Sequence, residues 1–403
     1  MKKLYTLTLP LFFTFLYVKA DFWTQKADFP GSGRQYPFSF SIGNKGFFGG
    51  GRDSTYNNLY DFWEYDSGTN IWTQKANYPG ASGYVAVGFS INDKGYAGTG
   101  LSSNNSVYYQ DFWEYDPTAN TWTQKANYGG GDRAGIATFT INGKGYLATG
   151  RQSTAGFVDL WQYDPQTNLW TQKSDFPGTP RWDANCFTIG NSGYLIGGYS
   201  FSSGYVGDVY EYNSISDSWT QKASFLPNGR CDAATFSICD KGYYGTGQNL
   251  SGMYNDFWEY NPVSNSWIQK ADVTTLLRNE PAYFSIGTKG YIGMGYNSSG
   301  PYLKDFWEYT PDSACATGID EIAEYNLEFS INPNPAKDFI SINYLLINDK
   351  INTNLAIADV QGRIVFKSKL SQSPISVKDF SNGIYFVELN NGKQKVVKKF
   401  VKE

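Results

Sequence analysis

Two short phrases recur through the first three quarters of the chain at a nearly constant spacing. The phrase Asp-Phe-Trp-Glu-Tyr, or a close variant, begins at Asp61, Asp111, Asp159, Asp208, Asp256 and Asp305. The phrase Trp-Thr-Gln-Lys, or its variant with Ile, begins at Trp23, Trp72, Trp122, Trp170, Trp219 and Trp267. A period near 50 residues predicts a propeller or a solenoid, because one such unit cannot bury its faces alone.

The residues between these phrases predict short β-strands. One glycine per repeat can be aligned, with Ile four residues and Phe six residues before it: Gly46, Gly95, Gly145, Gly193, Gly242 and Gly290. Alternation of bulky and small side chains with a period of two is typical of a strand with two unlike faces. Each of the six repeats therefore predicts four strands, and no helical pattern appears in this part of the chain.

The two ends of the repeat region complement one another. Residues 21–26 form a lone Trp strand, and the last repeat stops after residues 305–309 without a Trp strand of its own. We expect the N-terminal strand to complete the sixth repeat. Such pairing joins the ends of a ring and removes an open sheet edge.

Over residues 21–311 the repeat resembles the kelch repeat. The features in common are a pair of small residues at the end of the second strand, such as Gly197-Gly198, then a Tyr-Asp or Tyr-Asn pair, and a Trp behind it; two repeats depart from the small pair, at Thr99 and Met294. The resemblance implies an all-β fold, a six-bladed kelch-type β-propeller closed by the N-terminal strand.

Residues 1–20 have the pattern of a secretory signal peptide. Two lysines precede an apolar run over residues 7–18, and the segment ends in Val18-Lys19-Ala20. The apolar run is too short to span a bilayer, and the sequence has no other candidate for a transmembrane segment. We expect a mature chain that starts at Asp21 and is secreted or held on the outer cell surface.

A different composition begins near residue 327, where both the repeat and tryptophan cease. The segments Asn-Pro-Asn-Pro-Ala at 332–336, Asp-Val-Gln-Gly-Arg-Ile-Val at 359–365, Asn-Gly-Ile-Tyr-Phe-Val at 382–387 and Lys-Lys-Phe-Val at 398–401 follow in order. Together they resemble the type A C-terminal sorting domain of Bacteroidota cargo proteins of the type IX secretion system.

This second resemblance implies a small β-sandwich C-terminal domain over residues 327–403. The domain acts as an export address for the type IX secretion machinery and is usually cut off at the outer surface. Residues 312–326 are the expected linker. The alternative that the residues leave open is an immunoglobulin-like binding module.

Composition excludes several classes of chemistry. With 33 Lys and Arg against 37 Asp and Glu, and a pI near 5.2, the chain has no basic footprint for nucleic acid. The chain has no histidine, which excludes His-dependent triads and His metal sites. The copper chemistry of galactose oxidase, a kelch-type enzyme with His ligands, therefore cannot be carried over, and we expect no metal and no cofactor.

The four cysteines have no C-x-x-C spacing. Disulfides are permitted in an exported protein. The turns after the first and third strands lie on the same face of a blade, so Cys239 and Cys315 are expected on one face of adjacent blades. A Cys239–Cys315 disulfide is one hypothesis, and free cysteines are the other; Cys186 is expected to fill space near the axis.

The start of each inner strand carries the candidate site. Twelve positions before the aligned glycine stand Arg34, Arg133, Arg181, Arg230 and Arg278, with Gly83 in the second repeat. The next two positions include Tyr36, Tyr84, Trp182, Asp183, Asp232 and Glu280. We predict that these residues line one mouth of the central channel. Guanidinium groups capture carboxylates well, but they also bind loop carbonyls, and the acids could simply neutralise them.

Two functions fit this pattern. The first is a non-catalytic surface module that recognises an anionic glycan or acidic peptide at the channel mouth, with aromatic rings stacked on a sugar face. The second is a carbohydrate-active enzyme. Bacterial kelch proteins include a sialic acid epimerase, and a similar epimerase or mutarotase would use a carboxylate such as Glu280 or Asp232 to transfer a proton. We favour the first, because no residue pair has a nucleophile–base spacing and a fold alone does not give a function.

Overall fold

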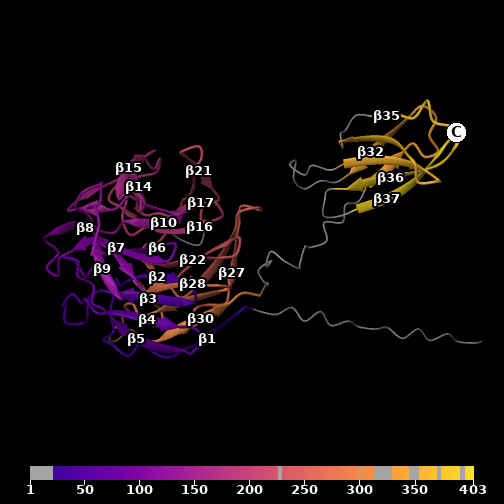
Figure 1. Ribbon diagram of the computed structural model, residues 1–403. Coiled ribbons are helices and arrows are strands. Elements are labelled where there is room, and N and C mark those ends of the chain that lie inside the picture. Colours follow the sequence, from indigo (N-terminus) through magenta and orange to yellow (C-terminus); the bar gives the residue numbers. More distant parts are fainter. Residues whose placement is uncertain are drawn as a thin grey trace, which may run out of the picture. The chain divides into compact units, whose positions relative to one another are not determined.

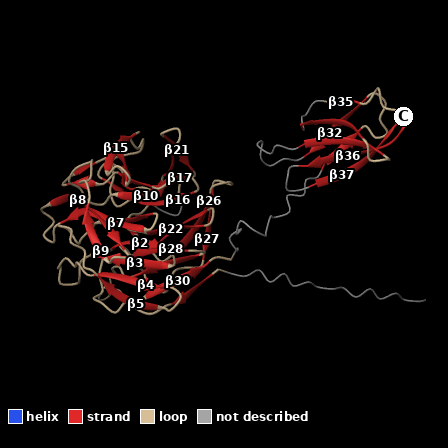
Figure 2. Cartoon of the chain, viewed as in Figure 1, coloured by secondary structure: helices blue, strands red, loops and turns tan. Residues whose placement is uncertain are grey.

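The computed structural model describes residues 21–225, 229–298, 300, 302–312, 329–344, 354–369, 374–390 and 395–403. The chain divides into two compact units, Met1–Cys315 and Ala316–Glu403, called here the propeller unit and the C-terminal unit. The described residues form strands and loops without a helix (Figure 2). The predicted signal peptide, nearly all of the predicted linker, and Cys315 lie outside them.

Six four-stranded antiparallel sheets make up the described part of the propeller unit. The first strands of sheets 1 to 6 are β2 (Phe38–Ile42), β6 (Val87–Ile91), β10 (Ala137–Ile141), β16 (Asn185–Ile189), β22 (Ala234–Ile238) and β28 (Ala282–Ile286). The second strands are β3 (Lys45–Gly49), β7 (Lys94–Leu101), β11 (Lys144–Ala148), β17 (Ser192–Ile196), β23 (Lys241–Gly245) and β29 (Lys289–Gly293).

The outer half of each sheet carries the two repeated phrases. The third strands are β4 (Phe62–Asp66), β8 (Tyr108–Asp116), β14 (Leu160–Asp164), β20 (Val209–Asn213), β26 (Phe257–Asn261) and β30 (Phe306–Thr310). The fourth strands of sheets 1 to 5 are β5 (Ile71–Lys75), β9 (Thr121–Gln124), β15 (Leu169–Lys173), β21 (Ser218–Lys222) and β27 (Ser266–Lys270). In sheet 6 the fourth strand is β1 (Phe22–Gln25), which pairs with β30 in antiparallel register from Phe22 opposite Thr310 to Gln25 opposite Trp307.

The first strands lie innermost and the fourth strands lie outermost (Figure 1). Strand β2 contacts β6 and β28, β10 contacts β6 and β16, and β22 contacts β16 and β28. Three short hairpins extend the loops between second and third strands: β12 (Arg151–Gln152) with β13 (Ala155–Gly156), β18 (Tyr199–Ser200) with β19 (Gly204–Tyr205), and β24 (Gln248–Asn249) with β25 (Gly252–Met253). This arrangement is all-β and propeller-like.

The aligned glycine of each repeat is explained by the sheet before it. A Cβ atom added to Gly95 would lie 2.2 Å from the Phe40 ring, and one added to Gly46 would lie 2.0 Å from the Phe284 ring. The same contact recurs in the other four sheets. The inner-strand Phe of one sheet therefore packs where the next sheet has no side chain, and sheet 1 receives the Phe of sheet 6.

The outer-strand tryptophans link neighbouring sheets in the same order. The Trp72 indole donates to the Ala27 carbonyl at 2.9 Å, and the Trp23 indole donates to the Ala271 carbonyl at 2.9 Å. Trp72 also packs edge-on against Phe306, with ring centroids 4.9 Å apart. These half-buried rings hold sheets together, as the repeat pattern predicts.

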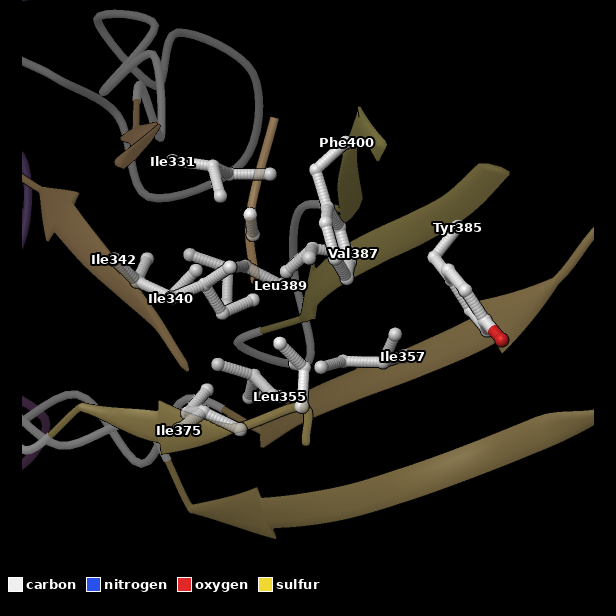
Figure 3. Packing of buried hydrophobic residues seen from close by; sticks show 12 residues of the cluster. Ile331, Ile340, Ile342, Leu355, Ile357, Ile375, Tyr385, Val387, Leu389 and Phe400 are labelled. Carbon is white, nitrogen blue, oxygen red and sulfur yellow. The ribbon is translucent and has the colours of Figure 1, made fainter. Parts of the chain in front are cut away.

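The C-terminal unit is a sandwich of two sheets. One contains β31 (Phe329–Asn332), β32 (Phe339–Tyr344) and β35 (Ile375–Ser376). The other has the order β34 (Ile364–Lys369), β33 (Asn354–Asp359), β36 (Gly383–Asn390) and β37 (Lys395–Lys402). Their facing side chains form one apolar core, in which Ile340, Ile357 and Val387 point toward one another (Figure 3).

Candidate functional site at the channel mouth

The five aligned arginines lie inside the sheets. Arg34, Arg181, Arg230 and Arg278 have 0% of their surface exposed and Arg133 has 2%. Each pairs with the aspartate that opens the Asp-Phe-Trp-Glu-Tyr phrase of its own sheet. The Arg34 guanidinium, for example, donates to both Asp61 oxygens at 2.7 and 2.8 Å and to the Gly50 carbonyl at 2.9 Å.

This placement corrects the prediction that the arginines hold an anionic ligand. Their donors are used within the protein, and the ring of Phe29 covers the Arg34 guanidinium at 4.9 Å. A fully buried guanidinium with a bidentate carboxylate partner is a structural element. The alternative interpretation, in which the arginines bond to nearby loop groups, fits the structure.

Sheet 2 has Gly83 at the position of the arginine and uses different contacts there. A Cβ on Gly83 would lie 2.0 Å from the Leu59 carbonyl oxygen, so the sheet has no room for a side chain there. The Ser82 hydroxyl donates instead to the Leu101 carbonyl at 2.7 Å. One buried oxygen of Asp111, the aspartate of this sheet, has no hydrogen-bond partner.

Two residues beyond the arginine position, each sheet contributes one residue to the channel mouth. This mouth ring consists of Tyr36, Val85, Gly135, Asp183, Asp232 and Glu280, and all six have positive φ, between 52 and 65°. Left-handed backbone is costly for residues other than glycine and tends to persist where a functional site requires it.

Backbone hydrogen bonds connect the mouth ring from sheet to sheet. The Glu280 amide donates to the Asp232 carbonyl at 2.9 Å, the Asp232 amide to the Asp183 carbonyl at 3.3 Å, and the Asp183 amide to the Gly135 carbonyl at 2.9 Å. The Tyr36 amide donates to the Glu280 carbonyl at 3.2 Å. These bonds bring three acidic side chains from consecutive sheets to one place.

Asp232 is the best-bonded of the three carboxyl groups. It accepts from the Tyr36 hydroxyl at 2.8 Å, the Cys231 thiol at 2.9 Å and the Gln248 amide at 3.1 Å. Glu280 accepts from the Gln35 amide at 3.1 Å in the amide orientation that satisfies both ends of Gln35. Tyr36, Gln35 and Gln248 come from another sheet or from a loop, so the assembly of the sheets and loops fixes these carboxyl groups.

The three carboxyl groups hold their protons more tightly than ordinary acids. Burial raises the pKa of Glu280 well above its usual value, and the charges of Asp232 and Asp183 add to the rise. Burial and the charge of Asp232 likewise raise the pKa of Asp183. Burial also raises the pKa of Asp232, although the hydrogen bonds from Cys231, Tyr36 and Gln248 oppose it. Three carboxylates this close cannot all ionise readily.

The mouth ring opens on a pocket of about 110 Å³ that is also lined by Asn185 and Tyr283. The Asn185 amide of sheet 4 donates to the Tyr283 hydroxyl of sheet 6 at 3.2 Å, so the two side chains meet across the channel. A second cavity, of about 280 Å³, shares Tyr283 and is lined by Ser and Thr side chains of the inner strands. The Asn185–Tyr283 pair therefore lies on the lining of the mouth pocket, and Tyr283 also reaches the second cavity.

Trp182 is buried, in contrast to the prediction of an open stacking face. Its ring packs against Tyr199 and Phe201, with centroids 5.0 and 4.6 Å away, and the Arg151 guanidinium lies 5.3 Å from it. Only 7% of Trp182 is exposed, whereas 57% of Phe201 is. Phe201 therefore offers an aromatic surface to solvent next to Trp182.

Tyr84 is also covered rather than open. The Arg52 guanidinium lies 4.0 Å from the Tyr84 ring centroid, and Tyr36 meets Tyr84 edge-on at 5.3 Å. Tyr36 remains partly exposed toward the pocket. Of the predicted site residues, the structure thus brings Tyr36, Asp183, Asp232 and Glu280 together at the pocket.

The predicted site residues do not include those at the starts of the loops between second and third strands, although the sequence places these loops on the same face as the arginines. Isolated bridges pair Gln35 with Arg52 and Ala134 with Arg151. A signal was available, because these loop residues occupy the same position in every repeat, directly after the small pair. Two repeats have an arginine at that position, Arg52 and Arg151, and the charges of these arginines act on Glu280 and Asp183 respectively.

Cys239 is disulfide-bonded, while Cys186 and Cys231 are free and buried. The hypothesised partner, Cys315, lies outside the described residues, and the pairing stays a prediction. Within the described ranges, no group of three or more Asp, Glu or Cys is arranged to hold a metal ion. The same ranges contain no helix that is long and apolar enough to cross a bilayer.

Comparison with known proteins separates the two units. Residues 330–403 match the family model of the secretion system C-terminal sorting domain. No curated protein matches the chain. Among solved structures, the chain resembles YjhT, a kelch-type propeller, with a TM-score of 0.61 and 17% identity over 70% of this chain and 95% of that chain. That likeness shows a propeller-like fold alone.

The sorting domain decides where the protein works. A C-terminal domain of this family directs its cargo through the type IX secretion system. The protein is therefore exported by type IX secretion to the cell surface or the extracellular space, and residues 330–403 are its sorting domain.

Proposed function

We propose that the protein is an exported binding module that holds a sugar in the mouth pocket. The observation that carries the proposal is the convergence of three buried carboxyl groups with raised pKa values and the Tyr36 hydroxyl on one small pocket. Concave sites with a few converging polar groups are the usual place for a small ligand.

The charge state of the pocket favours a hydroxylated, neutral ligand. A carboxyl group that keeps its proton can both donate and accept hydrogen bonds, which matches the hydroxyl groups of a sugar. The exposed Phe201 ring beside the mouth offers an apolar face for a sugar ring. The buried arginines leave no comparable support for an anionic glycan or acidic peptide as the ligand.

Binding by the purified chain tests the proposal. A glycan array would first identify the best sugar, and calorimetry would then compare Asp183→Asn and Phe201→Ala with the parent chain. We expect each variant to lose about tenfold in affinity, as one polar contact or one stacking contact is worth about 1–2 kcal/mol.

Leu250→Ala is the matched control, because Leu250 is an exposed apolar residue (93%) at the tip of another hairpin of the same unit. Equal losses in Leu250→Ala and Phe201→Ala would count against a site beside Trp182. Binding of an acidic peptide that is lost when Arg181 is replaced would support the hypothesis that the arginines bind the ligand. If the protein instead binds amines, with an affinity that falls strongly with salt, the ligand is a cation and not a sugar.

A second candidate is an enzyme that acts on sugars. The specific observation in its favour is the raised pKa of Glu280 beside Asp232, since a buried carboxyl group with a raised pKa is the kind of group that acts as a general acid. NMR spectra of candidate sugars with and without the protein would show accelerated anomer exchange or epimerisation. Loss of that exchange in Glu280→Gln with retained binding would establish catalysis, and unchanged spectra would leave the binding function alone.

For the scaffold, we propose a closed, six-bladed ring. The support is the pairing of β1 with β30, the contact of β2 with β28, and the packing of Phe284 against Gly46. Deletion of residues 21–26 should then expose the edge of β30 and cause aggregation or loss of cooperative unfolding. A truncated chain that melts like the intact one would refute closure. We further propose residues 21–311 as the propeller, 312–326 as the linker and 327–403 as the sorting domain.

A further inference from the structure

The outer face of the larger sheet in the sorting domain is unusually apolar. Ile364 is 61% exposed, Val397 47%, Ile384 41% and Phe386 37%. An antiparallel sheet with one face on a core normally turns polar side chains to solvent on the other. Here the inward positions, such as Ile357 and Val387, are fully buried. Four outward positions are exposed apolar residues, and Lys367, Glu388 and Lys399 lie on the same outward face.

Strand register places these side chains next to one another. Ala358 pairs with Ile364 on one side and with Phe386 on the other, so the three share a face. Ala356 pairs with Glu388, which in turn pairs with Val397. The small Ala358 lies between the larger Ile364 and Phe386, and Ala356 lies between Lys367 and Glu388. A groove of about 380 Å³ lies over the two alanines.

The groove also carries charged side chains of both signs, because Lys367 and Glu388 line it. Lys367 lies opposite Ala356, and Lys399 lies opposite Phe386. Both lysines are exposed. A partner that complements the groove needs an apolar ridge flanked by carboxylates.

We propose that this groove is the surface by which the sorting domain docks on a component of the type IX export machinery. The partner surface would carry an apolar side chain between Ile364 and Phe386 and acidic side chains toward Lys367 and Lys399. The family match covers the whole groove, and a sorting tail implies an interaction with the type IX machinery. Exposed apolar patches often mark such contacts. The proposal does not depend on the ligand of the propeller.

The sorting domain supplies a matched pair of variants. Phe386 lies in the groove, and Phe339, which is 53% exposed, lies on the other sheet of the sandwich. Each would be changed to Gln in the full chain, expressed in a type IX secretor, and followed by surface labelling of intact cells and by fractionation. We expect Phe386→Gln to lower the surface-displayed fraction about tenfold with retention in the periplasm, as loss of an interface anchor typically does, and Phe339→Gln to be exported like the parent.

Two further variants keep the test decisive if Phe386→Gln does not fold. Phe386→Leu retains an apolar wall and should be exported, whereas Ala358→Leu keeps the face apolar but fills the groove and should block export. Thermal melts of the purified chains verify folding. Normal export of both Phe386→Gln and Ala358→Leu, or an equal block by Phe339→Gln, would overturn the proposal. A parent chain that sediments as a dimer and becomes a monomer in Phe386→Gln would show instead that the groove binds a second copy.

Discussion

Two sets of charges lie almost side by side in the propeller unit and are treated in opposite ways. Arg230 and Asp232 are two residues apart, but Arg230 points into its sheet and pairs with Asp256, whereas Asp232 faces the mouth pocket beside Asp183 and Glu280. The first set is compensated charge by charge and recurs in five of the six repeats. The second set is present in three repeats and has no such compensation.

This difference separates residues that recur in the repeats, which are structural, from residues that occur in only some repeats, which can serve a function. A residue that recurs with the repeat solves a problem that every sheet has, and here that problem is the anchoring of the loop before the inner strand. A residue that departs from the repeat is free of that task. Asp183, Asp232 and Glu280 stand where other sheets have Tyr36, Val85 and Gly135, so they distinguish one side of the mouth from the other.

The largest expected effect comes from breaking a compensated pair. Arg230→Ala should destabilise the propeller unit by about 3–5 kcal/mol, because it leaves Asp256 without its cation and empties a fully buried space. Arg151→Ala, a partly exposed arginine beside the mouth, should cost about 1 kcal/mol or less.

Urea unfolding followed by tryptophan fluorescence measures both variants, because all 12 tryptophans precede residue 312 and so report the propeller unit alone. A chain that unfolds at the parent's urea midpoint after Arg230→Ala would show that the pair is dispensable. The arginines would then again be candidates for ligand binding.

A smaller effect should separate Asp256→Asn from Asp111→Asn. Asp256 accepts two hydrogen bonds from a buried guanidinium, whereas Asp111 belongs to the sheet that lacks the arginine. We expect a cost of about 2–3 kcal/mol for Asp256→Asn and about 1 kcal/mol or less for Asp111→Asn. Equal costs in the same urea experiment would mean that the tryptophan hydrogen bond common to both sites, not the arginine, makes the aspartate important.

The smallest effects are those of pH, and they should have opposite signs in the two sets. Burial acts to raise the pKa of Asp61, but the hydrogen bonds and charge of Arg34 outweigh it and lower that pKa. Asp61 therefore contributes stability above its ordinary pKa near 3.8, and that contribution is lost as the pH falls through the lower, folded-state pKa.

For the mouth acids the sign is reversed. The folded-state pKa of Glu280 lies above its ordinary value of 4.5, so its contribution is complete below pH 4.5 and is lost as the pH rises toward the raised pKa. Each unit of difference corresponds to about 1.4 kcal/mol. Glu280→Gln should flatten the decline in the urea midpoint on the alkaline side. If the parent chain shows no decline there, the mouth acids are not protonated in the folded state.

Much of the fold could be predicted, because the same pattern of strands occurs in six repeats. The spacing of the Trp phrases predicted four-stranded units, and the missing Trp strand after Tyr309 predicted the pairing of residues 21–26 with the last repeat, which the register of Trp23 opposite Tyr309 bears out. The sorting domain was recognisable from segments such as 332–336, and the family match confirms it.

The candidate site could be predicted only in part. The sequence indicated that Arg230 and Asp232 both begin an inner strand, but a strand start with left-handed backbone sends neighbouring side chains in directions that periodicity does not specify. Trp182 looked like a site residue because it was outside the repeat, yet Tyr199 and Phe201 cover it. The contacts of Trp182 with Tyr199 and Phe201 depend on the hairpin of β18 and β19, and the sequence pattern does not predict the geometry of that hairpin.

The sequence alone thus determined what local patterns can encode: the repeat, the strand order within each unit, the export address and the absence of histidine chemistry. The tertiary structure decided which charged groups form ion pairs and which lie together at the mouth pocket. Pairing of Arg34 with Asp61 joins residues 27 positions apart, and the approach of Tyr36 to Asp232 joins residues 196 positions apart. Such proximity arises only when the sheets assemble, and proximity in a region of low dielectric is what sets the protonation and availability of a charged group.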